Sequence, residues 1–206
     1  MTPLQQRALT AAILAPLFLF AVYLGDVIFA VMIVAISLIG FAEWLGLART
    51  GGEKILGLFY LGLPAFCLIW LRQQGLAPIL MVILAVWLTD TGAYFAGRHF
   101  GGPKLAPKIS PNKTWSGLIG GMVAAALVTG LVALAFRLEI WGVYFGVGAM
   151  LAVIAQIGDL FESHMKRRAG VKDSGKIMPG HGGVLDRIDG LLSAAPCFAL
   201  FVWLMA

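Results

Sequence analysis

The chain is dominated by apolar runs that are long enough to cross a bilayer as helices. Its 206 residues are 60% hydrophobic and only 12% charged, and the mean hydropathy is +0.92. These values exclude an ordinary soluble domain. We therefore predict an all-α fold, a polytopic integral membrane bundle with about seven transmembrane helices. The predicted spans are residues 8–24, 27–47, 55–72, 76–97, 116–136, 140–160 and 187–206.

The polar residues concentrate in two linkers, residues 98–115 and 161–186. We expect one membrane domain over residues 1–206, in which residues 1–75 form N-terminal helices and residues 76–206 form the catalytic helices with both polar loops.

The basic residues indicate how the helices are oriented. If the N-terminus is cytoplasmic, thirteen of the fifteen Lys and Arg residues lie on the cytoplasmic side, and only Arg72 and Arg137 lie outside. This bias follows the positive-inside rule and predicts a cytoplasmic N-terminus and two cytoplasmic polar loops. The net charge of +5 then describes a basic face that meets lipid head groups or phosphates. Nucleic acid is a poor partner, because no soluble basic domain is present.

Asp90 lies inside the fourth predicted span, in the segment Trp87-Leu88-Thr89-Asp90-Thr91-Gly92. An ionised carboxylate at the middle of a bilayer costs about 2.5–3.5 kcal/mol on the insertion scale, so such residues usually serve a function. The alternative is a polar clamp between helices, made through Thr91 or Tyr94.

A polar stripe runs along the end of the sixth predicted span. Gln156, Asp159, Ser163 and Lys166 recur at intervals of three, four and three residues, which places them on one helical face. Such a stripe on an apolar span points into the bundle or into a wet cavity. Glu162 lies at a less certain angle, where a capping or solvated role competes with a role in the site.

Asp186 and Asp189 stand one helical turn apart at the start of the seventh span. Acidic residues are favoured at helix N-termini in any case, by roughly 0.3–1 kcal/mol. However, Asp159 arrives at the same membrane depth from another helix. Three aspartates ringed by basic residues suit Mg²⁺ and polyphosphate. The seventh span is short, so this turn is expected at the level of the lipid head groups.

The loop over residues 98–115 contains Ser110-Pro111-Asn112-Lys113-Thr114-Trp115-Ser116-Gly117. Its basic and hydroxyl side chains would make a cradle for nucleotide phosphates. It is not a Walker loop, because the GxxxxGK[ST] spacing is missing. An ordinary positive-inside loop would explain the lysines equally well.

The polar string in the last third of the chain resembles the signature of the phosphatidate cytidylyltransferases, the CDP-diacylglycerol synthases. That signature reads S-x-x-K-R-x-x-x-x-K-D, followed after a short gap by P-x-H-G-G-x-x-D-R-x-D. The segments that begin at Asp90 and at Ser110 are also similar to segments of that family. The signature is matched here by Ser163, Lys166, Arg167, Lys172, Asp173, Pro179, His181, Gly182, Gly183, Asp186, Arg187 and Asp189.

The resemblance implies transfer of a cytidylyl group from CTP to phosphatidic acid, with Mg²⁺ as cofactor; whether a second cation joins it is left open. It also implies an enzyme of the bacterial inner (plasma) membrane whose active site faces the cytoplasm. A homodimer is compatible with the sequence. The implied catalytic residues are Asp159, Asp186, Asp189, Lys166 and Arg167; the metal ligands are Asp159, Asp186 and Asp189, with Asp90 as a further candidate; and the substrate-binding residues are Ser110, Lys113, Ser163, Lys172, Asp173, His181 and Arg187.

Three other functions compete with this interpretation. Asp186 to Gly190 imitates the start of the CDP-alcohol phosphatidyltransferase motif, but Ser193 and Ala194 stand where that motif requires Ala and Arg. A CTP-dependent lipid-alcohol kinase would need the same metal and membrane. An ion-coupled transporter would place polar residues near the bilayer midplane, whereas here they cluster at one face.

Overall fold

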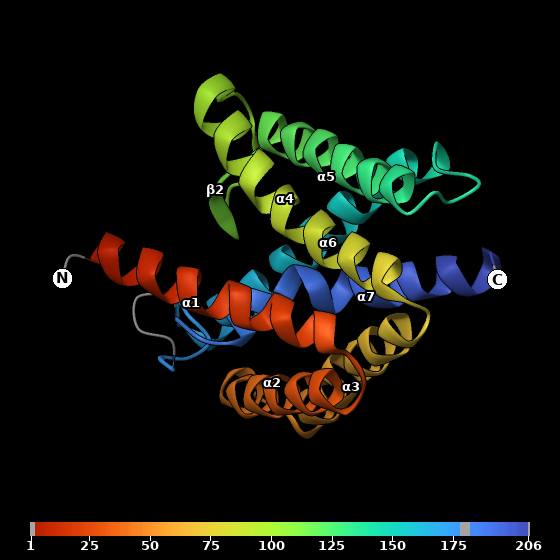
Figure 1. Ribbon diagram of the computed structural model, residues 1–206. Coiled ribbons are helices and arrows are strands. Elements are labelled where there is room, and N and C mark those ends of the chain that lie inside the picture. Colours follow the sequence, from red (N-terminus) through yellow and green to blue (C-terminus); the bar gives the residue numbers. More distant parts are fainter. Residues whose placement is uncertain (1–2, 178–181, 206) are drawn as a thin grey trace.

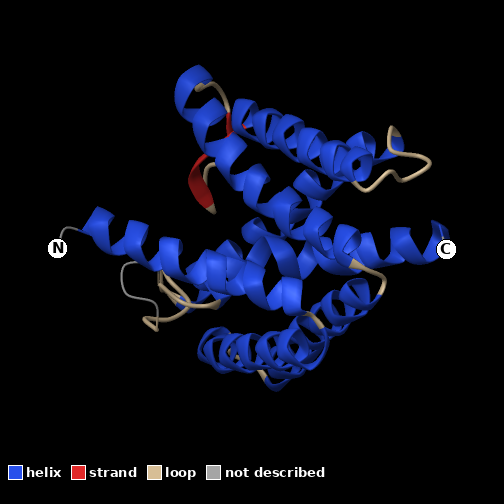
Figure 2. Ribbon diagram, viewed as in Figure 1, coloured by secondary structure: helices blue, strands red, loops and turns tan. Residues whose placement is uncertain are grey.

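The structure, a computed structural model, describes residues 3–177 and 182–205, with side chains from Thr10 onward except Ala11. It forms a helical bundle with one short β-hairpin (Figures 1 and 2). The elements are α1 (Pro3–Leu24), α2 (Asp26–Leu47), α3 (Gly51–Gln73), α4 (Leu76–Phe100), β1 (Lys104–Ala106), β2 (Ser110–Thr114), α5 (Trp115–Ala135), α6 (Val143–Ala169) and α7 (Leu185–Met205).

The prediction of an all-α membrane bundle with about seven helices is confirmed. In the described part of the chain, six helices, α2 to α7, are long and apolar enough to cross a membrane. In α1 the apolar stretch among the residues with described side chains, Ala12–Leu24, is shorter.

Most helix ends lie within a few residues of the predicted spans, and two larger differences stand out. Helix α6 does not end at residue 160 but continues to Ala169. Its last turns are stabilised by packing, because Glu162, Ser163, Met165 and Lys166 are buried. It ends at Gly170, which adopts the left-handed conformation that glycine favours at a helix C-terminus, with φ at 77°. The expected loop over residues 98–115 contains the antiparallel pair β1 and β2, in which Lys104 faces Thr114.

Small residues let α4, α5 and α6 pack closely. A Cβ atom on Gly92 of α4 would lie 2.7 Å from the carbonyl oxygen of Gly120 in α5, and one on Gly148 of α6 would lie 2.4 Å from that of Ala125. No larger residue fits these crossings without moving a backbone.

The polar connections gather at one end of the bundle. Helices α4 and α6 end there, α5 and α7 begin there, and the hairpin lies at the same end, on the left in Figure 1. Helix α7 runs away from this end toward the C-terminus. The candidate site is therefore built from helix ends and the two polar loops.

Candidate functional site

Lys113 carries the hairpin onto the polar stripe of α6. Its ammonium group donates a hydrogen bond to Gln156 Oε1 at 2.7 Å and forms an ion pair with the carboxylate of Asp159. The hydroxyl of Ser163 donates to the other oxygen of Asp159 at 3.2 Å. The predicted stripe is confirmed as one face, since Gln156, Ser163 and Lys166 are buried and Asp159 is half-buried.

Lys166 joins α6 to the start of α7. Its ammonium group lies 3.0 Å from Glu162 Oε1 and 2.5 Å from Asp186 Oδ1. The side chains of Lys166, Glu162 and Asp186 are only 9%, 0% and 5% exposed. The solvated alternative for Glu162 is therefore wrong, because this carboxylate is fully enclosed. The Lys166–Asp186 ion pair forms a cross-link between the two helices.

The second oxygen of Asp186 holds the loop that precedes α7. Asp186 Oδ2 accepts hydrogen bonds from the backbone N–H of Ser174 at 2.9 Å, from the Ser174 hydroxyl at 3.0 Å and from the N–H of Gly183 at 2.9 Å. Both carboxylate oxygens of Asp186 are thus occupied by protein donors.

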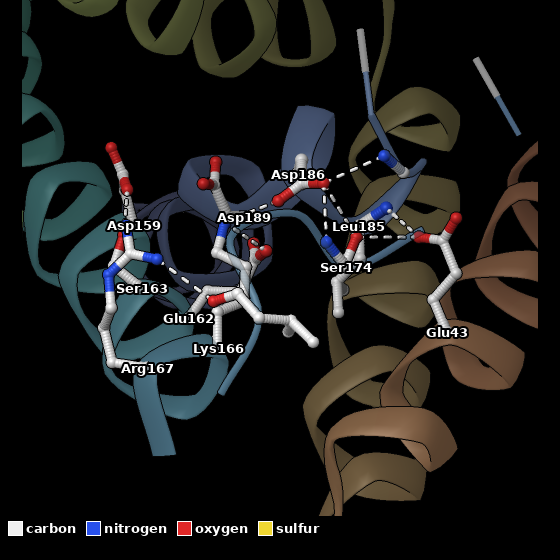
Figure 3. Close-up of polar contacts among 12 residues, drawn as sticks. Glu43, Asp159, Glu162, Ser163, Lys166, Arg167, Ser174, Leu185, Asp186 and Asp189 are labelled. Carbon is white, nitrogen blue, oxygen red and sulfur yellow. Dashed lines mark hydrogen bonds and ion pairs between the residues drawn. The ribbon is translucent and has the colours of Figure 1, made fainter. Parts of the chain in front are cut away.

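Asp189 lies one turn further along α7, where the backbones of α6 and α7 come close together. A Cβ atom on Gly158 would lie 2.8 Å from the carbonyl oxygen of Asp189, so the neighbouring Asp159 reaches the same region. The carboxylate of Asp189 accepts a hydrogen bond from the N–H of Gly190 at 2.6 Å, and no ion pair to it is found in the described ranges. It is near enough to Asp159 and Asp90 to be repelled by both. Figure 3 shows Asp159, Asp189 and Asp186 with the side chains around them.

Asp90 contributes from α4 to a cavity of about 190 Å³ beside the hairpin. The alternative, a polar clamp through Thr91 or Tyr94, is not found among the described residues: the Thr91 hydroxyl donates to the carbonyl of Trp87, and the Tyr94 hydroxyl accepts from Arg98. Among the residues that can be described, no hydrogen bond or ion pair to Asp90 is found. The other residues that line the cavity are Ala93, Tyr94, Asn112, Lys113, Thr114, Gly117, Leu118 and Gln156.

The remaining predicted site residues lie at the rim or outside this cluster. Arg167, Lys172, Asp173 and Arg187 are exposed, and Ser110 is half-buried at the start of β2. The guanidinium group of Arg167 donates to the carbonyl of Val171 at 3.0 Å. None of the four exposed charged residues takes part in an ion pair with another described residue. His181 lies outside the described residues.

Our sequence analysis missed Glu43 of α2. Its carboxylate is buried and accepts hydrogen bonds from the N–H groups of Val184 and Leu185 and from the Ser174 hydroxyl. The signal was present, because Glu43 lies within the predicted span 27–47, as Asp90 lies within span 76–97. The cost of a charge inside an apolar span applies equally to both.

The carboxylates of the site determine what kind of metal it could hold. Within residues 3–177 and 182–205, no three acidic, histidine or cysteine side chains are arranged around one metal position. Mg²⁺ is usually held by one or two carboxylates together with substrate phosphates and water. Asp159 and Asp189, with Asp90 as a further candidate, suit that mode, since a cation would relieve the repulsion among their charges. Asp159 and Asp186 would each first have to exchange a protein donor, since both oxygens of each carboxylate are engaged.

Comparison with known proteins agrees with the resemblance found in the sequence. Residues 5–71 and 48–205 match the model of the cytidylyltransferase family. A phosphatidate cytidylyltransferase of Brucella melitensis is 40% identical over an alignment that covers 98% of this chain and 94% of the relative. A phosphatidate cytidylyltransferase of Rickettsia typhi is 38% identical over 202 positions that cover 93% of this chain and 89% of the relative.

Proposed function

Because this chain belongs to the cytidylyltransferase family, we propose that it transfers a cytidylyl group from CTP to phosphatidic acid. The products are CDP-diacylglycerol and pyrophosphate. The observation that carries this proposal is the likeness to phosphatidate cytidylyltransferases over nearly the whole chain. The charged cluster at one end of an apolar bundle supports it, because a lipid phosphate and a nucleotide can meet there.

The reaction has to bring two anions together. A phosphate oxygen of phosphatidic acid attacks the α-phosphorus of CTP, and the bond from that phosphorus to the bridging oxygen breaks as pyrophosphate leaves. The attacking oxygen is already ionised, so no strong general base is needed. Two unit charges about 4 Å apart repel by about 4 kcal/mol at an effective dielectric constant near 20. Fixed positive charges that face the phosphates lower this barrier.

The structure suggests different roles for the basic residues. Lys113 borders the cavity beside Asp90, and we assign it to a phosphate of a substrate. Arg187 and Lys172 are exposed and free to contact a phosphate at the membrane surface. Lys166 is buried between two carboxylates, so we assign it to holding Asp186 in place. Arg167 and Ser110 lie at the rim, and their roles in catalysis and substrate binding stay predictions.

We further propose Mg²⁺ as the cofactor, held by Asp159 and Asp189 with Asp90 as a further ligand. When bound, the ion would neutralise charge on the phosphates and on the pyrophosphate that leaves. Binding to the folded protein alone would raise its thermal stability, so Mg²⁺ should raise the melting temperature of the wild type but not that of a variant with Asp159→Asn and Asp189→Asn. An equal shift in both proteins would contradict the assignment. A second cation remains a prediction.

We also propose that the end of the bundle that holds the site faces the cytoplasm of a bacterial inner membrane. The support is the set of thirteen basic residues that the positive-inside rule assigns to one side. A reporter active only outside the cytoplasm should therefore work when fused after Met205 and fail when fused within residues 172–176. A homodimer remains a prediction that cross-linking in the native membrane can test.

Labelled CTP tests the reaction itself. Purified protein, Mg²⁺ and phosphatidic acid should transfer the label of [α-³²P]CTP into the lipid product and leave the label of [γ-³²P]CTP in pyrophosphate. A CTP-dependent lipid kinase, given diacylglycerol, would instead transfer the γ label. Failure to transfer the α label with phosphatidic acid would overturn the proposed function.

A further inference from the structure

Glu43 connects α2 to the first turn of α7. Its Oε1 accepts the N–H of Val184 at 3.0 Å, and its Oε2 accepts the N–H of Leu185 at 2.8 Å. The first N–H groups of a helix have no partner within the helix, and a negative charge there is favourable. The side chain of Glu43 therefore caps a helix that lies more than a hundred residues away in the chain.

The same carboxylate reaches Asp186 through one serine. The Ser174 hydroxyl lies 3.0 Å from Glu43 Oε2 and 3.0 Å from Asp186 Oδ2. A hydroxyl group has one proton to donate, so the two carboxylates share one donor. Asp186 in turn pairs with Lys166. An unbroken series of polar contacts thus leads from α2 through the loop to α6 and α7, and Figure 3 shows its members together.

Two glycines allow the loop to close around Glu43. A Cβ atom on Gly175 would lie 2.2 Å from Glu43 Oε1 and 2.7 Å from its Cδ. A Cβ atom on Gly183 would lie 2.5 Å from Glu43 Oε2 and 2.1 Å from the Ser174 hydroxyl oxygen. The backbone therefore approaches the carboxylate so closely that no side chain fits on either side.

We propose that Glu43 is a positioning residue for the transfer reaction. By fixing the start of α7, it sets the direction in which Asp186 and Asp189 face α6. This inference rests on the proposed function, and it makes α2 a necessary part of a site whose other residues come from α4 to α7. Glu43 itself acts through Ser174, Val184 and Leu185.

The first test is Glu43→Gln, which keeps the size of the side chain. An amide offers one acceptor oxygen, and its NH₂ group cannot accept a backbone N–H, so at least one bond to α7 is lost. We expect kcat per folded molecule to fall by about 10- to 100-fold, since small displacements of reacting groups cost rates of this order. The KM for CTP should change less, by under about threefold, because Lys113, which borders the cavity, lies on β2 and not on α7.

Limited trypsin digestion gives a second measurement that does not depend on activity. Lys172 and Lys176 are exposed, and cleavage after them should be faster in Glu43→Gln because the loop has lost its anchor. Glu53→Gln is the matched control: this carboxylate, near the start of α3, binds Arg168 and the N–H of Arg49, and no hydrogen bond or ion pair joins it to residues 170–177 or 182–184. Its kcat and its cleavage rate should equal those of the wild type.

A double-mutant cycle tests the contact itself. Gly175→Ala should lower kcat by displacing the Glu43 carboxylate, and it should cause no further loss in a Glu43→Ala background. Independent, multiplying losses would overturn the proposal, as would wild-type kcat and trypsin cleavage in Glu43→Gln. An inactive wild type in the labelled CTP assay would refute the proposed function instead, and the trypsin comparison would still decide whether Glu43 anchors the loop.

Discussion

Lys113 and Asp159 form an ion pair although they are 46 residues apart and belong to different kinds of structure. Lys113 lies on strand β2 of the hairpin, whereas Asp159 lies inside α6. This contact joins the hairpin to α6 and places the ammonium group of Lys113 next to Asp159. A substrate phosphate that enters the cavity would compete with Asp159 for the same ammonium group.

Lys113→Ala should reduce kcat/KM by about 100-fold, because one fixed positive charge near the reacting phosphates is removed. The assay is transfer of label from [α-³²P]CTP to phosphatidic acid at several CTP concentrations. Lys54→Ala is the control, since Lys54 is exposed on α3 and lies outside the site. A loss in both variants would mean that general surface charge, and not Lys113, is responsible.

Asp189→Asn should abolish measurable turnover while membrane insertion stays intact. The carboxylate of Asp189 is repelled by the charges of Asp159 and Asp90, and no ion pair to it is found in the described part of the chain. Its charge is therefore expected to serve a bound cation. Steady-state assays and the yield of folded protein in detergent check the two halves of this prediction.

Asp26→Asn provides the control for Asp189→Asn. Asp26 begins α2 with φ at 44°, a conformation that Asn also tolerates, and it lies where α2 begins, away from the site. This variant should keep wild-type turnover. Near-normal activity in Asp189→Asn would defeat the assignment of that residue.

Lys166→Met should lower the free energy of unfolding by about 3–5 kcal/mol, because it leaves the buried carboxylates of Glu162 and Asp186 without their cation. By contrast, Arg168→Ala breaks the ion pair between Arg168 and Glu53, in which the Arg168 side chain is 42% exposed. This substitution should lower the free energy of unfolding by under about 1 kcal/mol. Denaturant unfolding of both variants in one detergent gives the comparison. Equal small losses would show that the Lys166 pairs are solvated.

Gly158→Ala should impair both stability and turnover. The added Cβ atom would lie 2.2 Å from the Ser193 hydroxyl oxygen and 2.8 Å from the carbonyl oxygen of Asp189, and overpacking of this kind costs about 1–3 kcal/mol. Gly146→Ala, on the same helix, meets nothing within 4 Å and should leave stability unchanged or raise it by up to about 1 kcal/mol. Thermal unfolding and turnover of the pair measure the difference.

The membrane spans could be predicted because each span is a local property of the chain. Hydropathy over about twenty residues is enough to identify a helix that crosses a bilayer. The stripe from Gln156 to Lys166 was also predictable, since helical periodicity depends only on spacing. The hairpin was not predicted, because its short strands are defined by pairing with each other and by Lys113 reaching α6.

The sequence by itself determined an apolar helical bundle, a polar face on α6 and the positions of the aspartates along the chain. Only the tertiary structure decided which polar groups from separate elements meet: Lys113 with Asp159, Lys166 with Asp186, and Glu43 with the start of α7. The physical reason is the separation along the chain over which each kind of interaction acts. Hydropathy and helical period act between near neighbours, whereas these contacts arise from the packing of separate elements, which brings together groups from 20 to 142 residues apart.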